Sequence, residues 1–500
     1  MSKNKNNKPV WSTRIKKNSS SLFAKVGSSI NIDKRLYKQD IYASTVHVEM
    51  LFKKKIISLQ VKNKIIWGLK KIFNEINKKK FTFNNQSEDI HMSIEKRLFD
   101  LIGDDAGFIH TARSRNDQVI VDFKLWMIDA SNDIVNEIDI TIKSIIKIAE
   151  KNIYTIMPSF THLKNAQPIS FAHYILAYVE MLNRDKKRFL YNKESLLENP
   201  LGVAAIAGTS FDIDREFTTK KLKFKKPTKN SIDTVSDRDF VLDFLYSISV
   251  CSNHISRFAE EFILWNSDAF DLIKLKDKVV TGSSIMPQKQ NPDTLEYLRG
   301  KTGHTYGNLF SMLTILKGLP LSYFKDLQDD KELAFKSFDQ IKISLQIMRE
   351  VLNNFIVNKK KMIQLAETGY TTATDLADYI VREHKYPFRK AYLVTSKIVN
   401  LAEQKGKKLS ELTVPEIKSI DKNLNESALK LFNLENSVKS KKSYGGTSFE
   451  NIKKMIKNIK NMFKKIFLIL FCAIIFFSCG KKGDPEYQGQ KNQLKVIKLI

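Results

Sequence analysis

The segment from Thr281 to Asp293, TGSSIMPQKQNPD, gathers the residue types of an acid/base catalyst into one short loop. Ser283 or Ser284 could handle a proton, and Lys289 and Asn291 are donors suited to an oxyanion or carboxylate that gains charge. The segment's glycine gives the backbone freedom, while its two prolines exclude a continuous helix. A polar surface turn would explain any one of these residues alone, but their combination predicts a mobile active-site loop.

A second segment, His110 to Gln118, reads HTARSRNDQ and suits a substrate with several carboxylates. Arg113 and Arg115 each present a planar guanidinium that can bond both oxygens of a carboxylate. Asn116 adds a further polar group beside them. An isolated Arg-Ser-Arg would more often be solvated surface, so the segment gains its meaning from the other motifs.

Two further segments carry polar groups of the same kind. Residues 157–168, MPSFTHLKNAQP, place Thr161 and His162 between prolines. Histidine titrates near neutral pH, which favours proton transfer here, although a lone histidine is more often structural. Residues 317–331, KGLPLSYFKDLQDDK, supply three hydrogen-bonding groups: Tyr323, Gln328 and Lys331.

The four segments together resemble the signatures of the fumarase/aspartase superfamily and, within it, of the argininosuccinate lyase family. The loop at 281–293 is similar to GSSxMPxKxNP, and residues 110–118 are similar to the box HTGRSRNDQ. Segments 157–168 and 317–331 resemble GYTHLQxAQP and KGLPxxYxxDxQxDK. The resemblance covers nearly the whole chain except its last forty or so residues, with the motifs in family order.

The resemblance implies reversible cleavage of argininosuccinate into arginine and fumarate, the last step of arginine biosynthesis. The implied catalytic residues are His162, Ser283, Glu296 and Lys289. Ser283 would abstract the proton and His162, paired with Glu296, would be the partner acid or base, but which of the two removes the proton stays open. A serine hydroxyl is a weak base, so this role requires a donor-rich loop.

Eight residues are implied by the resemblance to bind substrate: Ser29, Arg115, Asn116, Thr161, Asn291, Tyr323, Gln328 and Lys331. Four of them would contact the carboxylates of the succinate part: Ser29, Asn116, Thr161 and Asn291. Arg115 would add positive charge, and the three residues from 317–331 would hold the arginine part.

No metal and no cofactor is expected. The 8 histidines are scattered, and neither an HExxH pattern nor a cysteine pair at ligand spacing is present. A glycine-rich nucleotide loop is absent as well. Two alternatives remain for the function: another fumarate-releasing lyase of the superfamily, or a non-catalytic relative of the crystallin kind.

The sequence departs from the family pattern at four positions. Ser12 and Thr13 replace two glycines, and Gln290 stands where lysine is common. Ala112 replaces the glycine of the box. If position 112 requires a positive φ, alanine there costs about 1 kcal/mol or more.

The composition predicts long helices, since only 18 glycines and 11 prolines occur in 500 residues. Apolar residues recur at three- and four-residue steps from Val119 to Ala149, which indicates one long helix whose stripe other helices must cover. Asp239–Ala259 and Thr305–Leu316 continue the pattern, and the lysine-rich run Lys220–Asn230 is most simply a loop. We therefore predict an all-α chain with a long central bundle.

The resemblance implies a three-domain fumarase/aspartase-like fold and a homotetramer with each active site shared among subunits. The expected N-terminal helical domain covers 1–115, the central bundle domain 116–365 and the small C-terminal helical domain 366–460. A tail of different character covers 461–500.

The formal net charge is +29. Such basicity could indicate a nucleic acid or an anionic membrane, but the lysines are dispersed and form no dense arginine stripe, so we expect no nucleic-acid partner. The positive field would instead attract an anionic substrate. Only 3 cysteines occur, which excludes a disulfide scaffold and favours a reducing cytoplasm.

The tail resembles a bacterial lipoprotein signal. Met462–Lys465 is a positive segment with its own methionine, Ile466–Phe477 is an apolar run, and Cys479 lies where the lipidated cysteine would be. The run is shorter than the roughly 20 residues of a spanning helix. We expect a small lipoprotein reading frame joined to the enzyme. A native amphipathic tether is the alternative, and membrane association follows only if the tail is genuine.

Overall fold

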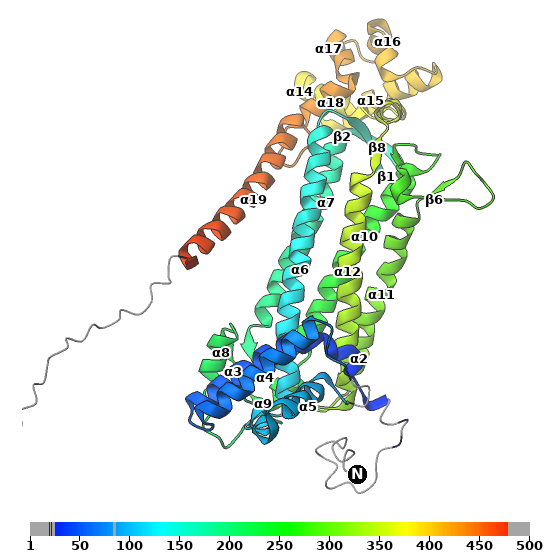
Figure 1. Cartoon of the computed structure of the whole chain (residues 1–500). Helices are drawn as coiled ribbons and strands as arrows, with labels where there is room; N and C mark the ends of the chain where they lie inside the picture. The colour runs from blue at the N-terminus through cyan, green and yellow to red at the C-terminus, as the bar shows by residue number, and fades with distance from the viewer. Residues whose placement is uncertain (1–19, 21, 23–25, 84–86, 479–500) are drawn as a thin grey trace, which may run out of the picture. The chain divides into compact units, whose positions relative to one another are not determined.

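The computed structural model describes residues 20, 22, 26–83 and 87–478, with side chains up to residue 464. The described chain is mainly helical, with a few short strands (Figure 1). This confirms the predicted helical class. By its internal contacts the chain divides into two compact units, residues 1–148 with 175–361, and residues 149–174 with 362 onwards. The division predicted near 115, 365 and 460 stays a prediction about domains.

In the first unit a small helical layer precedes the long helices. Its helices are α2 (Ile30–Asp33), α3 (Tyr37–Lys53), α4 (Leu59–Asn77) and α5 (Ile90–Ile102), with 3-10 turns η2 (Lys34–Leu36) and η3 (Gly103–His110). Asp89 starts α5, because its side chain accepts the backbone N–H of Met92 at 2.6 Å. α3, α4 and α5 pack around a buried apolar core that includes Leu51, Leu69 and Ile94.

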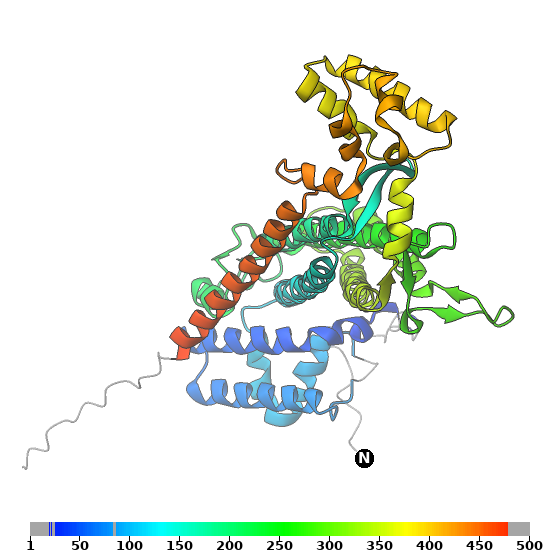
Figure 2. The same cartoon turned by 90° about the horizontal axis from the view of Figure 1, so that it is seen from above.

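Long helices form the body of the chain: α6 (Arg115–Lys151), α7 (Phe171–Ser195), α10 (Asp239–Asn266), α11 (Asp293–Leu316) and α12 (Asp330–Asn353). Within the first unit α10, α11 and α12 run side by side (Figures 1 and 2). The stripe predicted on α6 is confirmed, because its residues from Phe123 to Ala149 are buried. The predicted stripe, Val119 to Ala149, lies wholly inside this helix, which begins four residues earlier and ends two residues later.

Short elements connect the long helices of the first unit. They are α8 (Arg215–Lys221), α9 (Ser231–Ser236), β3 (Glu198–Asn199), β4 (Lys226–Pro227), β5 (Ile273–Leu275), η4 (Asp277–Val279), β6 (Thr281–Gly282), β7 (Gln290–Asn291), η5 (Lys325–Asp329) and β8 (Phe355–Val357). β3 pairs with β4 in parallel, while β5–β8 and β6–β7 pair antiparallel. The run Lys220–Asn230 is thus a loop except for the end of α8 and the two residues of β4.

The second unit contains a hairpin and smaller helices. Its elements are β1 (Ile156–Thr161), β2 (Lys164–Ser170), α14 (Ala373–His384), α15 (Phe388–Gln404), η6 (Leu409–Glu411), α16 (Val414–Lys418), α17 (Glu426–Leu429), η7 (Lys430–Phe432), α18 (Leu434–Ser440) and α19 (Phe449–Ser478), and α13 (Lys359–Glu367) leads into it. Its core includes Leu376, Ile380 and Ile398. Among the helices of the described residues, none has the length and apolarity that crossing a membrane requires.

Candidate active site

The box at residues 110–118 leads into α6, and one buried carboxylate anchors it. Asp117 has no exposed surface, and its Oδ2 accepts the backbone N–H groups of Gly202 at 3.0 Å and Ala204 at 2.9 Å. The side-chain amide of Asn116 donates to the carbonyl oxygen of Ala205 at 3.0 Å. Gly202 has a φ of +98° and no room for a side chain. The box and the 202–205 loop are therefore fixed against each other.

Arg115 is held by protein carboxylates. Its Nε lies 3.1 Å from Asp89, its Nη1 lies 3.1 Å from Glu95, and Nη1 also donates to Gln118 at 2.6 Å. Burial alone would lower the pKa of Arg115, but the charges of Asp89 and Glu95 raise it instead. Its guanidinium is thus oriented by three side chains of its own chain.

Ser29 comes just before α2, and its hydroxyl donates to Asp33 at 2.5 Å. The other oxygen of Asp33 accepts the backbone N–H of Ile90 at 3.0 Å, so Ser29 is connected to the start of α5. Lys325 lies close by, because its Nζ is 3.6 Å from Glu88, whose carbonyl oxygen accepts the backbone N–H of Ser29 at 2.8 Å.

Lys331 belongs to a buried group of three charged side chains. One oxygen of Asp330 lies 2.5 Å from Nε of Arg238, and the other lies 2.6 Å from Nζ of Lys331. Asp330 has no exposed surface, and Arg238 and Lys331 are buried. Tyr323 interacts electrostatically with this group, because burial and the charge of Asp330 raise the pKa of Tyr323 to about 12. Gln328 is half-buried in η5, two residues before Asp330.

The predicted mobile loop at residues 281–293 contains a hairpin, in which residues 283–289 join β6 to β7. The hydroxyl oxygen of Ser283 accepts the backbone N–H groups of Ile285 at 3.3 Å and Met286 at 3.1 Å. Two N–H groups that point at one oxygen stabilise negative charge on it, which is the donor-rich environment that a basic serine requires. Ser284 is exposed.

Other residues named in the sequence analysis lie in or next to this hairpin. Lys289 is exposed in the loop, and Asn291 is half-buried in β7. Glu296 is exposed in the first turn of α11, where it lies 3.9 Å from Arg299. The amide of Gln290 donates to Asp277 at 3.1 Å. The predicted pairing of Glu296 with His162 stays a prediction.

The two groups of site residues in the first unit are far apart within one chain. The hairpin with Ser283 precedes α11, and the segment from Tyr323 to Lys331 follows its other end. α11 has 24 residues, so at about 1.5 Å per residue the two groups are separated by about 36 Å. One chain therefore does not bring Ser283 and Lys331 together.

Thr161 and His162 lie in the second unit, at the tip of the β1–β2 hairpin. Thr161 pairs with Lys164, which leaves His162 and Leu163 as a two-residue turn. Both turn residues have a positive φ, 53° and 57°, as the tight turns favoured in hairpins require. His162 is exposed and displayed by the hairpin.

Two sequence-family profiles match this chain. A lyase family profile matches residues 13–307, and a profile for the C-terminal region of argininosuccinate lyase matches residues 370–439. The argininosuccinate lyase of Pelagibacter ubique is 67% identical over 460 residues, covering 92% of this chain and 100% of that protein. The chain belongs to the argininosuccinate lyase family. The lyase of Nitratiruptor sp. is 47% identical over 91% of this chain and 99% of that protein.

Solved structures show the same fold at lower identity. An EDDS lyase variant with bound fumarate matches with a TM-score of 0.78 and 24% identity, covering 93% of this chain and 94% of that chain. A class II fumarase from Schistosoma mansoni matches with a TM-score of 0.69 and 14% identity, over 83% of this chain and 94% of that chain. The fumarase/aspartase-like fold predicted from the motifs is therefore confirmed.

Three charged residues near the site had no predicted role. Arg238 and Asp330 form a buried pair, although Asp330 stands inside a segment that the sequence singled out. Asp89 lies in Glu88-Asp-Ile-His91, where a run of polar residues before an apolar helix was the available signal. Ser12 and Thr13, which replace family glycines, lie outside the described residues.

Ala112 has a φ of 58°, so position 112 does require the positive φ that glycine adopts most easily. We expect Ala112→Gly to raise the free energy of unfolding by about 1 kcal/mol, because glycine adopts this conformation without steric cost. Urea denaturation at a fixed protein concentration measures the change. Ala106→Gly, in η3 at a residue without positive φ, is the control and should lower stability. A loss of stability in Ala112→Gly would contradict the interpretation.

Proposed function

We propose that the protein cleaves argininosuccinate reversibly into arginine and fumarate. The observation that carries the proposal is the hydroxyl of Ser283, which faces two backbone N–H groups in a loop that also contains Lys289 and Asn291. Membership of the argininosuccinate lyase family supports this substrate among those of the superfamily.

The chemistry requires a base for a weakly acidic C–H group and an acid for the leaving nitrogen. Ser283, as the alkoxide that its two N–H donors stabilise, takes the proton from the carbon beside a carboxylate. The electron pair of that C–H bond moves onto the carboxylate and then forms the double bond of fumarate as the C–N bond breaks. His162, with Glu296 as its partner, supplies a proton to the guanidino nitrogen. The guanidino group then does not leave as an unstable anion.

We propose that the substrate is bound by residues from several segments that are distant in the sequence. We assign the succinate carboxylates to Ser29, Asn116, Thr161 and Asn291, with positive charge from Arg115 and Lys289. The arginine part is assigned to Tyr323, Gln328 and Lys331. Lys331 is fixed by Asp330, which suits a residue that must present one defined donor.

The active sites are proposed to form between subunits of a homotetramer. The support for this proposal is the length of α11, which keeps Ser283 and the Tyr323–Lys331 segment about 36 Å apart in one chain. A single small substrate cannot touch both groups. A neighbouring copy that places its own Ser283 hairpin beside Lys331 removes the difficulty. We also propose a cytoplasmic location, which agrees with the sparse cysteines.

The decisive experiment measures fumarate by its ultraviolet absorbance. Argininosuccinate is offered to the purified protein beside adenylosuccinate and aspartate, with His162→Asn as the inactive control. Asparagine tolerates the positive φ of position 162, so the turn should survive the substitution. Fumarate from argininosuccinate alone, lost in the variant, is the expected result. A folded tetramer that releases none would favour the non-catalytic, crystallin-like alternative.

We further propose that residues 461–500 are a lipoprotein-like extension joined to the enzyme. The Pelagibacter enzyme is matched over its full length while 8% of this chain is left unmatched, which supports an added segment. Cys479 lies outside the described residues. Sequencing the gene around Asn461 tests the proposal, because a stop codon or frame change there would separate the two segments.

A further inference from the structure

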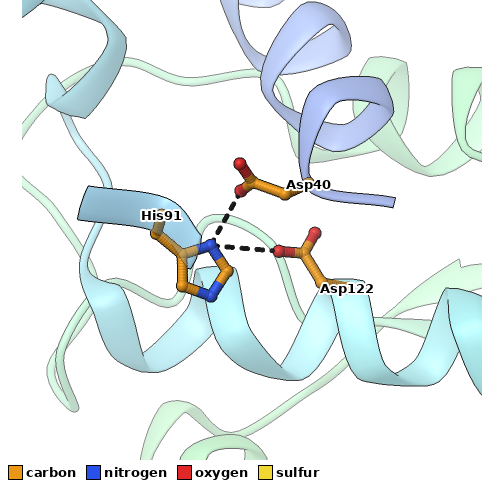
Figure 3. Close-up of side chains that lie close together, drawn as sticks. All are labelled: Asp40, His91 and Asp122. Carbon is orange, nitrogen blue, oxygen red and sulfur yellow. Dashed lines mark hydrogen bonds and ion pairs between the residues drawn. The ribbon is translucent and has the colours of Figure 1, made fainter. Parts of the chain in front are cut away.

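Three side chains with no part in the proposed reaction meet in the interior of the first unit (Figure 3). We call Asp40 of α3, His91 of α5 and Asp122 of α6 the positioning cluster. Nδ1 of His91 lies 2.9 Å from Asp40 and 3.4 Å from Asp122, so both carboxylates face the same nitrogen. Each of the three side chains is at most 1% exposed.

The two carboxylates differ in their hydrogen bonds. One oxygen of Asp40 contacts His91 and also accepts the side-chain amide of Gln118 at 2.6 Å. Within the described part of the chain, no N–H or O–H group donates a hydrogen bond to either oxygen of Asp122, which lies 3.4 Å from Nδ1 of His91. A buried carboxylate without donors is costly when ionised, so the arrangement favours a charged Asp40 and a neutral Asp122.

The pKa shifts of Asp40 and Asp122 agree with a charged Asp40 and a neutral Asp122. Burial alone would raise the pKa of Asp40, but His91, Arg113 and Gln118 together hold it well below its usual range. Burial and the charge of Asp40 raise the pKa of Asp122 well above its usual range. Two neighbouring carboxylates that cannot both ionise take different roles, one charged and one protonated.

A divalent cation is the other occupant that this spacing would suit, but the charges oppose it. An ionised Asp40 can only accept hydrogen bonds, so Nδ1 of His91 carries its hydrogen and has no lone pair for a metal. The buried guanidinium of Arg113, bound to Ser44 at 2.9 Å, already balances one carboxylate. Two ionised carboxylates, Arg113 and a divalent ion would leave an uncompensated positive charge in the interior.

A continuous chain of contacts leads from the cluster to the box at the start of α6. Gln118 donates its amide to Asp40 and accepts Nη1 of Arg115 with its oxygen, each at 2.6 Å. The amide has one orientation that satisfies both contacts, because its nitrogen only donates and its oxygen only accepts. A charged Asp40 therefore selects the orientation of Gln118 in which its oxygen faces Arg115.

We propose that the cluster is a positioning device: through Gln118 it orients Arg115, and so keeps the box that carries Asn116 in its substrate-binding geometry. This inference rests on the proposed function, since it assigns the box to the binding of argininosuccinate. Asp40 and Gln118 are then positioning residues, which act on substrate through Arg115 and its neighbour. Asp122 fills its position as a neutral acid.

The test compares Asp40→Asn with Asp122→Asn, which are the same chemical change on either side of His91. Asp40→Asn should raise the KM for argininosuccinate about tenfold with kcat within about threefold, because a hydrogen bond to a charged group is lost. Asp122→Asn should keep KM within about twofold, because an amide replaces a neutral carboxyl of the same shape. A variant that only unfolds in part would lower the apparent kcat and leave KM unchanged.

Gln118→Met is the second variant, in case Asp40→Asn does not fold, and a similar rise in KM is expected. An unchanged KM in both Asp40→Asn and Gln118→Met would overturn the inference, and so would equal effects of the two Asn substitutions. Activity lost on dialysis against a chelator and restored by a divalent cation would also overturn it. A wild-type protein that releases no fumarate would instead contradict the proposed function.

Discussion

Ser283→Ala is expected to lower the kcat for argininosuccinate cleavage by about a hundred- to ten-thousandfold, the contribution of a positioned proton-transfer group. The reason lies in the two N–H groups of Ile285 and Met286, which converge on the hydroxyl oxygen of this serine. Alanine removes the oxygen and leaves the donors and the hairpin in place. Initial rates of fumarate formation at saturating substrate measure the effect.

Ser284→Ala is the matched control, since it makes the same substitution one residue away at an exposed side chain. Its kcat should stay within a few-fold of the wild-type value. The KM of Ser283→Ala should also stay close to the wild-type KM, because the proton is removed only in the transition state. If kcat falls equally in both alanine variants, the loop requires both hydroxyl groups. The assignment of proton abstraction to Ser283 alone would then be wrong.

Asp330→Asn is expected to be the most destabilising single change in the site, costing about 3–5 kcal/mol of the free energy of unfolding. Asp330 is the one negative charge between Arg238 and Lys331, and all three side chains are buried. Neutralising it removes the carboxylate that joins the two buried positive charges of Arg238 and Lys331. Thermal and urea denaturation at matched protein concentration measure the loss.

Three further variants make this expectation specific. Arg238→Met should cost less than Asp330→Asn, because the remaining pair of Asp330 and Lys331 is neutral. Adding Arg238→Met to Asp330→Asn should recover part of the lost stability. Glu332→Gln removes an exposed ion pair with Lys336 on the same helix and should change stability by less than about 1 kcal/mol. A double variant less stable than Asp330→Asn would contradict the charge argument.

The elements that local pattern determines were predicted well. The apolar stripe after Asn116 predicted α6, and the structure buries the stripe from Phe123 onwards, because a three- and four-residue period describes one face of a helix whatever packs against it. The prolines of the 281–293 loop predicted the interruption before α11, which begins at Asp293. The conditional prediction about Ala112 was also local, since a glycine position in a motif indicates a positive φ.

The contacts between distant residues could not be predicted in the same way. Arg238 and Asp330 are 92 positions apart, and His91 and Asp40 are 51 apart, so no local period connects them. These residues pair because folding buries them, and a buried charged group that has lost its water needs a protein partner. The hairpin that carries His162 was missed for a related reason, because its register depends on pairing across two short strands with prolines in them.

The length of α11 has a consequence for how activity responds to dilution. If the hairpin at one end of this helix serves a different site from the segment at the other end, a dissociated chain contains no complete site. Catalysis per chain then depends on protein concentration, falling once dilution favours dissociated subunits. The helix would thereby make assembly a condition of catalysis, so that an isolated newly made chain is inactive until it meets its partners.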